Sequence, residues 1–137
     1  MVAVDQGQID QVLLNLYVNA AQAMPEGGEM VVHTENLFLS RDHMKASDLE
    51  PGPYVKVSVV DAGVGMDDAV RKRIFDPFFT TREMGEGTGL GLASAYGIIR
   101  NHGGVINVES EAGMWTAISF LLPAVATNKD SRDFRLT

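Results

Sequence analysis

The sequence predicts an α+β fold with two layers, in which a mixed sheet of about five strands is backed by three helices. Two observations predict this fold. Apolar residues recur at helical spacing in some segments, and they alternate with polar residues in others. A third observation is length, because 137 residues without internal repeats suit a single core. We expect one domain, residues 1–123, and a polar tail or linker, residues 124–137.

The first helix is predicted to begin at Asp5, because an aspartate followed three residues later by Gln8 is typical of a capped helix start. Apolar residues then keep the helical spacing as far as Ala23. Residues 25–28, which contain a proline and two glycines, end the pattern. The sequence therefore places a long amphipathic helix before the first strand.

Strands are predicted wherever apolar and polar residues alternate between turn signals. A polar loop, residues 40–53, separates the first two strands, and the last two are expected to form a hairpin that turns near Gly113. The predicted strands are residues 30–39, 54–61, 105–110 and 115–122.

Two more helices are predicted between the second and third strands. Asp67 and Asp68 are expected to cap a short helix that runs through Phe75. A longer helix, residues 90–102, follows a glycine-rich segment and is closed by two further glycines. The predicted order of elements is therefore one helix, two strands, two helices and two strands.

Charge and composition exclude several kinds of partner. The net charge of −7 argues against nucleic acid as a main partner. No apolar run approaches the length of a membrane span, so we expect no membrane insertion by this chain. The sequence contains no cysteine, which excludes disulfides and thiolate metal sites and fits the cytoplasm.

A polar seam runs along the first predicted helix, beside its apolar stripe. Leu14 and Val18 flank the seam and are expected to keep water away from it. Two carboxamides on adjacent turns then need partners, and an asparagine oxygen is a hard, neutral ligand that suits Mg²⁺. The seam consists of Gln8, Gln11, Asn15, Asn19 and Gln22.

A second candidate site is the segment "VVDAGVGM". Asp61 continues the inward alternation of the valines before it, so its carboxylate should point toward the core and need a donor. Gly63 and Gly65 permit a ligand to approach the backbone, and an adenine amino group is a suitable donor, with Met66 beside its ring. The alternative is an Asp-Gly turn in which Asp61 caps backbone amides.

A third candidate site is the segment "GEGTGLGL", residues 85–92, which has a glycine at every second position before a helix. Such glycines free backbone amides to hold phosphate at a helix start. Phe75, Phe78 and Phe79 are expected to anchor a mobile loop, although core packing is the alternative for at least one of them. Arg82 lies within reach of a terminal phosphate when the loop closes.

Four motifs together resemble the catalytic ATP-binding domain of bacterial sensor histidine kinases, within the Bergerat-fold ATP-binding superfamily. They are "QVLLNLYVNA", "DAGVGM", "RIFDPFFTT" and "GTGLGLA", in the order and spacing of that family. The resemblance covers residues 5–123, and the wording "FDPFFTT" is most similar to the nitrogen-sensor-like branch.

This resemblance implies a Bergerat fold with a flexible ATP lid, and ATP and Mg²⁺ as cofactors. It implies an enzyme, a protein-histidine kinase that transfers the γ-phosphoryl group of ATP in two-component signal transduction. The acceptor would be a histidine on an upstream dimerisation hairpin that is absent from this chain, and a response regulator receiver domain would be the later partner. The full-length kinase could carry a membrane anchor, with this domain in the cytoplasm.

The resemblance also implies the roles of individual residues. Asn19 would hold the metal ion, Asn15 and Arg82 would act in catalysis, and Asp61 would accept the adenine amino hydrogen bond. The remaining residues implied to contact the nucleotide are Gly63, Gly65, Met66, Ile74, Thr81, Gly87, Thr88, Gly89, Leu90, Gly91, Leu92 and Thr116.

Three residues depart from the family pattern. Gln22 stands where many members carry a lysine, Thr80 where many carry a basic residue, and Trp115 where many carry a glycine. Arg82 is a candidate replacement for the missing basic residue.

Two other functions in the superfamily are kept as alternatives. ATP-hydrolysing members carry a glutamate as general base one turn before the metal-binding asparagine, and Asn15 at that position disfavours hydrolysis. A non-catalytic nucleotide switch would keep the nucleotide pocket but would not transfer the phosphoryl group. His33, His43 and His102 lack the acidic neighbour of an acceptor, so we interpret them as structural or surface residues.

Overall fold

The computed structural model describes residues 5–40, 49–76 and 91–124. The described elements agree with the predicted ones to within a few residues at each end, which is the usual uncertainty of helix and strand boundaries. In chain order they are α1 (Gln6–Ala23), β1 (Met30–Leu39), β2 (Gly52–Asp61), α2 (Asp68–Arg73), α3 (Gly91–Asn101), β3 (Val105–Glu111) and β4 (Trp115–Pro123).

The sheet corrects one prediction, because its described part is antiparallel and has four strands in the order β1-β2-β4-β3. The mixed sheet of about five strands is therefore wrong for the described residues. The passage through α2 and α3 makes β3 run in the same direction as β2. However, β4 lies between these two strands, so no parallel pair forms.

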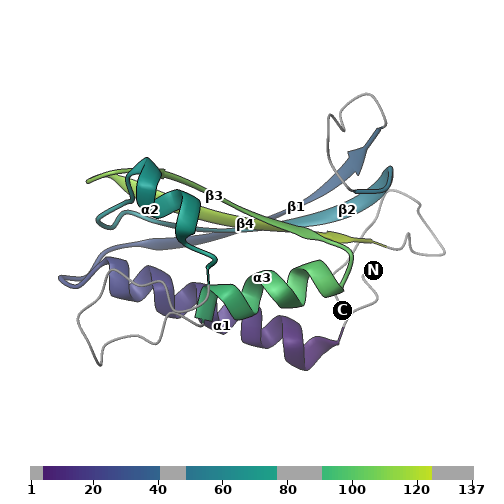
Figure 1. Cartoon of the computed structure of the whole chain (residues 1–137), viewed down its shortest axis with the longest axis horizontal. Helices are drawn as coiled ribbons and strands as arrows, with labels where there is room; N and C mark the ends of the chain where they lie inside the picture. Colours follow the sequence, from purple (N-terminus) through teal and green to yellow (C-terminus); the bar gives the residue numbers. More distant parts are fainter. Residues whose placement is uncertain (1–4, 41–48, 77–90, 125–137) are drawn as a thin grey trace.

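The helices α1 and α3 lie side by side on one face of the sheet (Figure 1). The short α2 packs beside β3, and the strands curve over the two longer helices. Between the layers lies a continuous core of buried residues from α1, α3 and the three strands β2, β3 and β4. It comprises Ile9, Val12, Leu16, Ala20, Val55, Val57, Val59, Ala95, Ile99, Ile106, Ile118, Phe120 and Leu122.

The inner face of the sheet changes from apolar to polar at one end. Residues paired across antiparallel strands share a face, and the side chains of β2, β4 and β3 therefore form rows across the sheet. Two apolar rows are Val57–Phe120–Ile106 and Val59–Ile118–Val108. The next row, here called the polar row, is Asp61–Thr116–Ser110.

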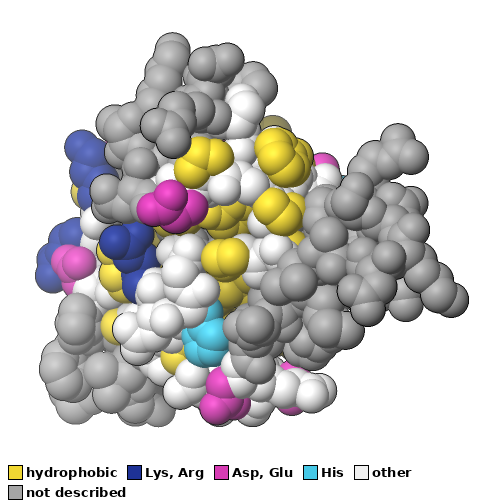
Figure 2. Space-filling view, turned by 90° about the vertical axis from the view of Figure 1, so that its right-hand side faces the viewer, with side chains coloured by type: hydrophobic (Ala, Val, Ile, Leu, Met, Phe, Trp, Pro, Cys, Tyr) yellow, Lys and Arg dark blue, Asp and Glu magenta, His cyan; other side chains and the backbone are white. Residues whose placement is uncertain are grey.

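The outer face of α1 corrects a second prediction. Leu14 and Val18 are 53% and 45% exposed, so they do not shield the polar seam from water. The core instead lies against the opposite stripe of α1, which Leu16 represents. Large hydrophobic side chains reach the surface elsewhere as well, such as Phe38 on β1, and Figure 2 shows several on one face.

Among the described residues, none of the helices is long and apolar enough to cross a membrane. Of the predicted tail, residues 124–137, only Ala124 lies within the described part of the chain, and β4 ends at Pro123.

Candidate functional site

The loop that follows β2, residues 62–67, is held from two sides. The Val64 amide donates to the carbonyl oxygen of Ala23 at the end of α1 (3.0 Å), and the Gly113 amide donates to the Val64 carbonyl (2.6 Å). A Cβ on Gly63 would collide with the Ala23 carbonyl, so only glycine fits there. The loop therefore joins the end of α1 to the β3–β4 turn.

Gly65 is needed in this loop for two reasons. Its φ of +68° lies in the left-handed region that side chains disfavour. A Cβ at this position would also collide with the carbonyl of Glu111 on β3. The glycines of the "DAGVGM" segment thus permit close packing of backbone against backbone, in addition to any approach by a ligand.

Asp61 lies at the end of β2 and points inward, as predicted, with 3% of its surface exposed. Its Oδ1 accepts a hydrogen bond from the Gly63 amide (2.9 Å), which is the turn contact of the alternative interpretation. Among the described residues its Oδ2 has no hydrogen-bond partner, so this oxygen is left for a ligand. Burial raises the pKa of the carboxyl group, and the Gly63 hydrogen bond opposes this rise.

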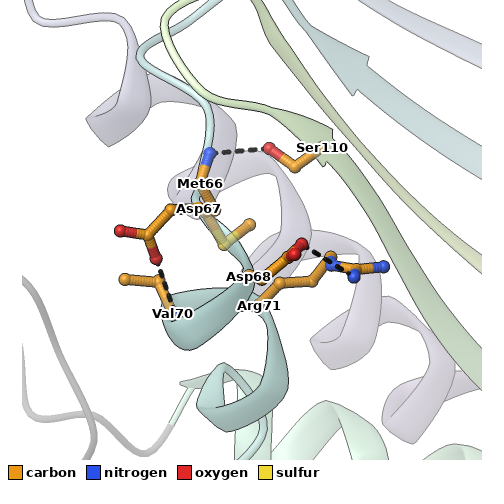
Figure 3. Close-up of polar contacts among 6 residues, drawn as sticks. All are labelled: Met66, Asp67, Asp68, Val70, Arg71 and Ser110. Carbon is orange, nitrogen blue, oxygen red and sulfur yellow. Dashed lines mark hydrogen bonds and ion pairs between the residues drawn. The ribbon is translucent and has the colours of Figure 1, made fainter.

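The rest of the polar row connects Asp61 to the neighbouring strands. Thr116 is the register partner of Asp61 and is 2% exposed. Its Oγ1 lies 2.8 Å from the Oγ of Ser110. The Ser110 hydroxyl also accepts from the Met66 amide (2.7 Å), as Figure 3 shows. The polar row thereby extends into the loop that carries the predicted base-binding residues.

The polar seam of α1 contacts the start of α3. The Asn15 side chain donates from Nδ2 to the carbonyl oxygen of Gly91 (2.8 Å) and accepts at Oδ1 from Nε2 of Gln11 (2.8 Å). Asn15 therefore binds the first residue of α3 at its backbone. The structure brings together two motifs that lie far apart in the sequence.

Asn19 is half-buried, and its side chain makes no hydrogen bond to another described residue. Its amide oxygen is neutral and hard, and such an oxygen suits Mg²⁺, which takes its remaining ligands from phosphates and water. The side chain therefore fits a role as one of the ligands of a nucleotide-bound magnesium ion.

The other predicted residues divide into two groups. Ile74 directly follows α2 and is half-buried, and Leu92 in the first turn of α3 packs on the core. The predicted lid and its phosphate-binding residues lie in residues 77–90, outside the described part. These are Phe78, Phe79, Thr80, Thr81, Arg82, Gly87, Thr88, Gly89 and Leu90.

The histidines fit the structural role predicted for them where they are described. His102 accepts at Nε2 from the Asp5 amide (3.1 Å), so its proton is on Nδ1, which contacts the carbonyl of Ile98 (2.8 Å). The imidazole thus ties the start of α1 to the end of α3. His33 is exposed on β1, and His43 lies outside the described residues.

Ser110 is the residue near the site that the sequence analysis missed. The signal was available, because Ser110 continues the inward alternation of Ile106 and Val108 as a polar residue at the end of a strand. The same reasoning identified Asp61. Trp115 is the residue before Thr116 in β4, so its side chain lies on the opposite, outer face of the sheet. It is one of the residues that depart from the family pattern.

A shallow depression of about 330 Å³ lies elsewhere, between α2 and β3. Of the residues named for the candidate sites it contains only Phe75, an expected anchor of the lid. Its lining consists of Arg71, Lys72, Phe75, Ile106, Asn107 and Val108.

The sequence matches a known family model and parts of known sensor kinases. A model of the family described as histidine kinase-, DNA gyrase B-, and HSP90-like ATPase matches residues 4–126. The sensor kinase CckA of Brucella abortus (strain 2308) is 44% identical over 133 residues, 96% of this chain and 14% of that protein. The sensor histidine kinase ZraS of Escherichia coli (strain K12) is 40% identical over 126 residues, 92% of this chain and 24% of that protein. The chain thus spans only a small part of these relatives.

Two solved structures resemble the chain in three dimensions. The nucleotide-free catalytic domain of histidine kinase ThkA has a TM-score of 0.70 and 33% identity, covering 89% of this chain and 70% of that one. Full-length ShkA in complex with AMPPNP has a TM-score of 0.68 and 30% identity, covering 89% of this chain and 22% of that one. These likenesses confirm the predicted α+β class.

Proposed function

Because this chain belongs to the histidine kinase-, DNA gyrase B- and HSP90-like ATPase family, we propose that it binds Mg-ATP as the catalytic domain of a sensor histidine kinase. The observation that carries the proposal is the buried Asp61, which retains one carboxylate oxygen without a partner among the described residues. No described side-chain polar atom is both fully buried and without a partner, so this oxygen is open to solvent and can accept from a ligand such as the amino group of adenine.

In the proposed complex, Asp61 accepts the adenine amino hydrogen bond at Oδ2 while the Gly63 amide holds Oδ1. The glycine loop lies against the base edge, because Gly63 and Gly65 present backbone without side chains. Met66 and Ile74, both half-buried, line the ring. Base selectivity then follows from hydrogen bonding, since an acceptor at Asp61 rejects a base that presents an acceptor there.

The phosphates are proposed to lie along the polar seam and the start of α3. Asn19 would contribute an amide oxygen to Mg²⁺, and that ion, when bound, neutralises negative charge on the triphosphate. Asn15 holds the Gly91 carbonyl and so fixes the start of α3 relative to the seam. The glycines and Thr88 of residues 87–92 would bind phosphate oxygens, with Thr81 and Arg82 in the lid.

The proposed reaction is an in-line transfer from ATP to a histidine nitrogen. The bond between the γ-phosphorus and the bridging β–γ oxygen breaks, a phosphorus–nitrogen bond forms, and ADP leaves. Catalysis relies on position and charge rather than on a protein base. The acceptor histidine would be on a dimerisation hairpin outside this chain, and a response regulator would receive the phosphoryl group next.

We further propose that residues 1–123 form the domain, that residues 124–137 are a tail or linker, and that the domain works in the cytoplasm. The family match to residues 4–126 supports this extent.

Calorimetric titration of the chain with AMPPNP, with Mg²⁺ and with EDTA, tests the proposal. We expect a single site whose affinity depends on Mg²⁺ and which prefers adenine over guanine nucleotides. The absence of binding at millimolar AMPPNP would contradict nucleotide binding itself, and equal affinity for the two bases would contradict the role of Asp61.

A further inference from the structure

The hydroxyl group of Ser110 on β3 uses its full hydrogen-bonding capacity. It accepts from the Met66 amide (2.7 Å) and donates to the carbonyl oxygen of Trp115 (2.8 Å). Because its single proton is directed at Trp115, the contact with Oγ1 of Thr116 (2.8 Å) must be one in which Thr116 donates. One donor and two acceptor positions are therefore all occupied.

Ser110 and Thr116 are already register partners in the β3–β4 pair, so the contact that the sheet itself does not supply is the one to Met66. Trp115 and Thr116 belong to β4, whereas Met66 belongs to the loop after β2. Met66 directly precedes Asp67, whose side chain accepts from the Val70 amide (2.9 Å) and caps α2. Figure 3 shows this arrangement, with the Ser110 side chain reaching from β3 to the point where the loop enters α2.

The two ends of the loop have different anchors. Val64 is held through its own backbone by Ala23 and Gly113. Among the described residues, the side chain that holds the Met66 amide is that of Ser110. Loss of the Ser110 hydroxyl would thus release one end of the loop and leave the other end anchored.

We propose that Ser110 is a positioning residue for recognition of the nucleotide base. It does not touch the base. It fixes the Met66 end of the loop, and through Thr116, the register partner of Asp61, it fixes the floor of the same pocket. This inference rests on the proposed function, because it assigns Ser110 to the adenine pocket of that site.

The test compares three variants of the chain. Ser110→Ala removes the hydroxyl, Ser110→Thr restores one, and Ser119→Ala is the matched control. Ser119 lies on β4 and donates to the Ser58 hydroxyl (2.9 Å) on the outer face of the sheet, away from the loop. Each variant is titrated with ATP and with GTP in the presence of Mg²⁺, and its melting temperature is measured.

We expect Ser110→Ala to weaken ATP binding about tenfold, equal to about 1.4 kcal/mol, with little effect on the weaker binding of GTP. The ratio of the two affinities should therefore fall. Ser110→Thr should recover most of the ratio, and Ser119→Ala should leave it unchanged. A fall in melting temperature alone, with the ratio preserved in Ser110→Ala, would overturn the proposal, because it would indicate a purely structural role.

Amide hydrogen exchange supplies a second measurement that does not depend on nucleotide. In Ser110→Ala the Met66 amide should exchange faster, whereas the Val64 amide should stay protected by Ala23. Unchanged exchange at Met66 would overturn the proposed anchor. If the unsubstituted chain fails to discriminate between ATP and GTP, the proposed function fails in its base-reading role, while this exchange result still decides whether Ser110 holds the loop.

Discussion

Asp61 shows at the scale of one residue how a binding group can lower the stability of the fold that carries it. Burial raises the pKa of its carboxyl group. Because the pKa is higher in the folded state than in the unfolded state, protonated Asp61 stabilises the fold. This stabilisation is fully present below the unfolded-state pKa, about 3.9. It is lost as pH rises through the folded-state pKa. The ionised side chain therefore lowers the free energy of unfolding at neutral pH.

Asp61→Asn should accordingly stabilise the nucleotide-free chain at about pH 7 and weaken ATP binding at least about tenfold. The amide cannot ionise, but it can present a donor where adenine requires an acceptor. Thermal unfolding without nucleotide measures the first effect, and the gain in melting temperature should shrink as pH falls toward about 4. Titration with ATP measures the second.

The matched control is Asp10→Asn, which removes the same charge from an exposed position on α1. It should leave ATP binding unchanged. A lower melting temperature for Asp61→Asn at neutral pH would mean that the ionised carboxylate is stabilised by a contact outside the described residues.

Asn19→Ala should abolish the Mg²⁺-dependent part of ATP binding and leave the melting temperature nearly unchanged. The side chain makes no hydrogen bond to another described residue, so its loss leaves no partner unsatisfied. Titration with ATP in Mg²⁺ and in EDTA should give the same affinity for the variant. Asn36→Ala, at an exposed position on β1, is the control. Persistent stimulation by Mg²⁺ in Asn19→Ala would remove Asn19 from the metal site.

At the scale of elements, two glycines that look alike in the sequence have opposite roles. Gly97 lies inside α3, where an added Cβ meets no atom within 4 Å. Gly97→Ala should therefore raise the free energy of unfolding by about 1 kcal/mol, because alanine favours the helix. Gly65→Ala should lower it by about 1–2 kcal/mol from its positive φ alone, and further through the collision with Glu111.

Urea denaturation of both glycine variants measures these changes, with equal slopes expected if the folded states are equally compact. Stabilisation by Gly65→Ala would show that the loop adopts another conformation than the one described.

Local patterns predicted the elements well because each depends on neighbours in the sequence. Alternation identified β2, β3 and β4, whose inner faces are buried, and the segment with proline and glycines ended α1. Pairing order depends instead on which strands meet in space, and alternation carries no information about it. That is why the insertion of β4 between β2 and β3, and hence the antiparallel sheet, could not be predicted.

The same limit applies to exposure on α1. Helical spacing predicted the buried stripe, but Leu14 and Val18 were expected to keep water away from the polar seam and are instead exposed. A stripe becomes buried only where another element packs on it, and α3 and the sheet cover the other side.

At the scale of the whole molecule, the site depends on convergence of segments from α1, the loop after β2, α3 and β3. The sequence predicted a metal-ligand role for Asn19 from its residue type and its place on the polar seam, and an acceptor role for Asp61 from its inward position, and both roles stay predictions. It did not predict that Asn15 holds Gly91 or that Ser110 holds Met66, since both contacts join distant segments. The lid prediction stays a prediction, because residues 77–90 lie outside the described part.

The isolated chain should bind Mg-ATP yet neither hydrolyse it appreciably nor label itself. Hydrolysis needs a base to activate water, and Asn15, at the position where hydrolysing relatives are expected to carry glutamate, has its amide engaged by Gly91 and Gln11. Self-labelling needs a histidine that has a free ring nitrogen and the acidic neighbour of an acceptor. Both ring nitrogens of His102 are in hydrogen bonds to the backbone, and the exposed His33 is followed by a threonine.

Incubation with γ-labelled ATP, with and without a separate histidine-bearing hairpin from a related kinase, distinguishes these outcomes. Labelling of the hairpin should be slow, because a domain supplied in trans lacks the effective concentration of a tethered one. The control is the same incubation with Asn19→Ala, which should label nothing. Rapid phosphate release by the isolated chain would assign it to the hydrolysing members of the family. Stable labelling of His33, His43 or His102 would contradict an acceptor outside the chain, because the phosphoryl group would then have a receiver within these 137 residues.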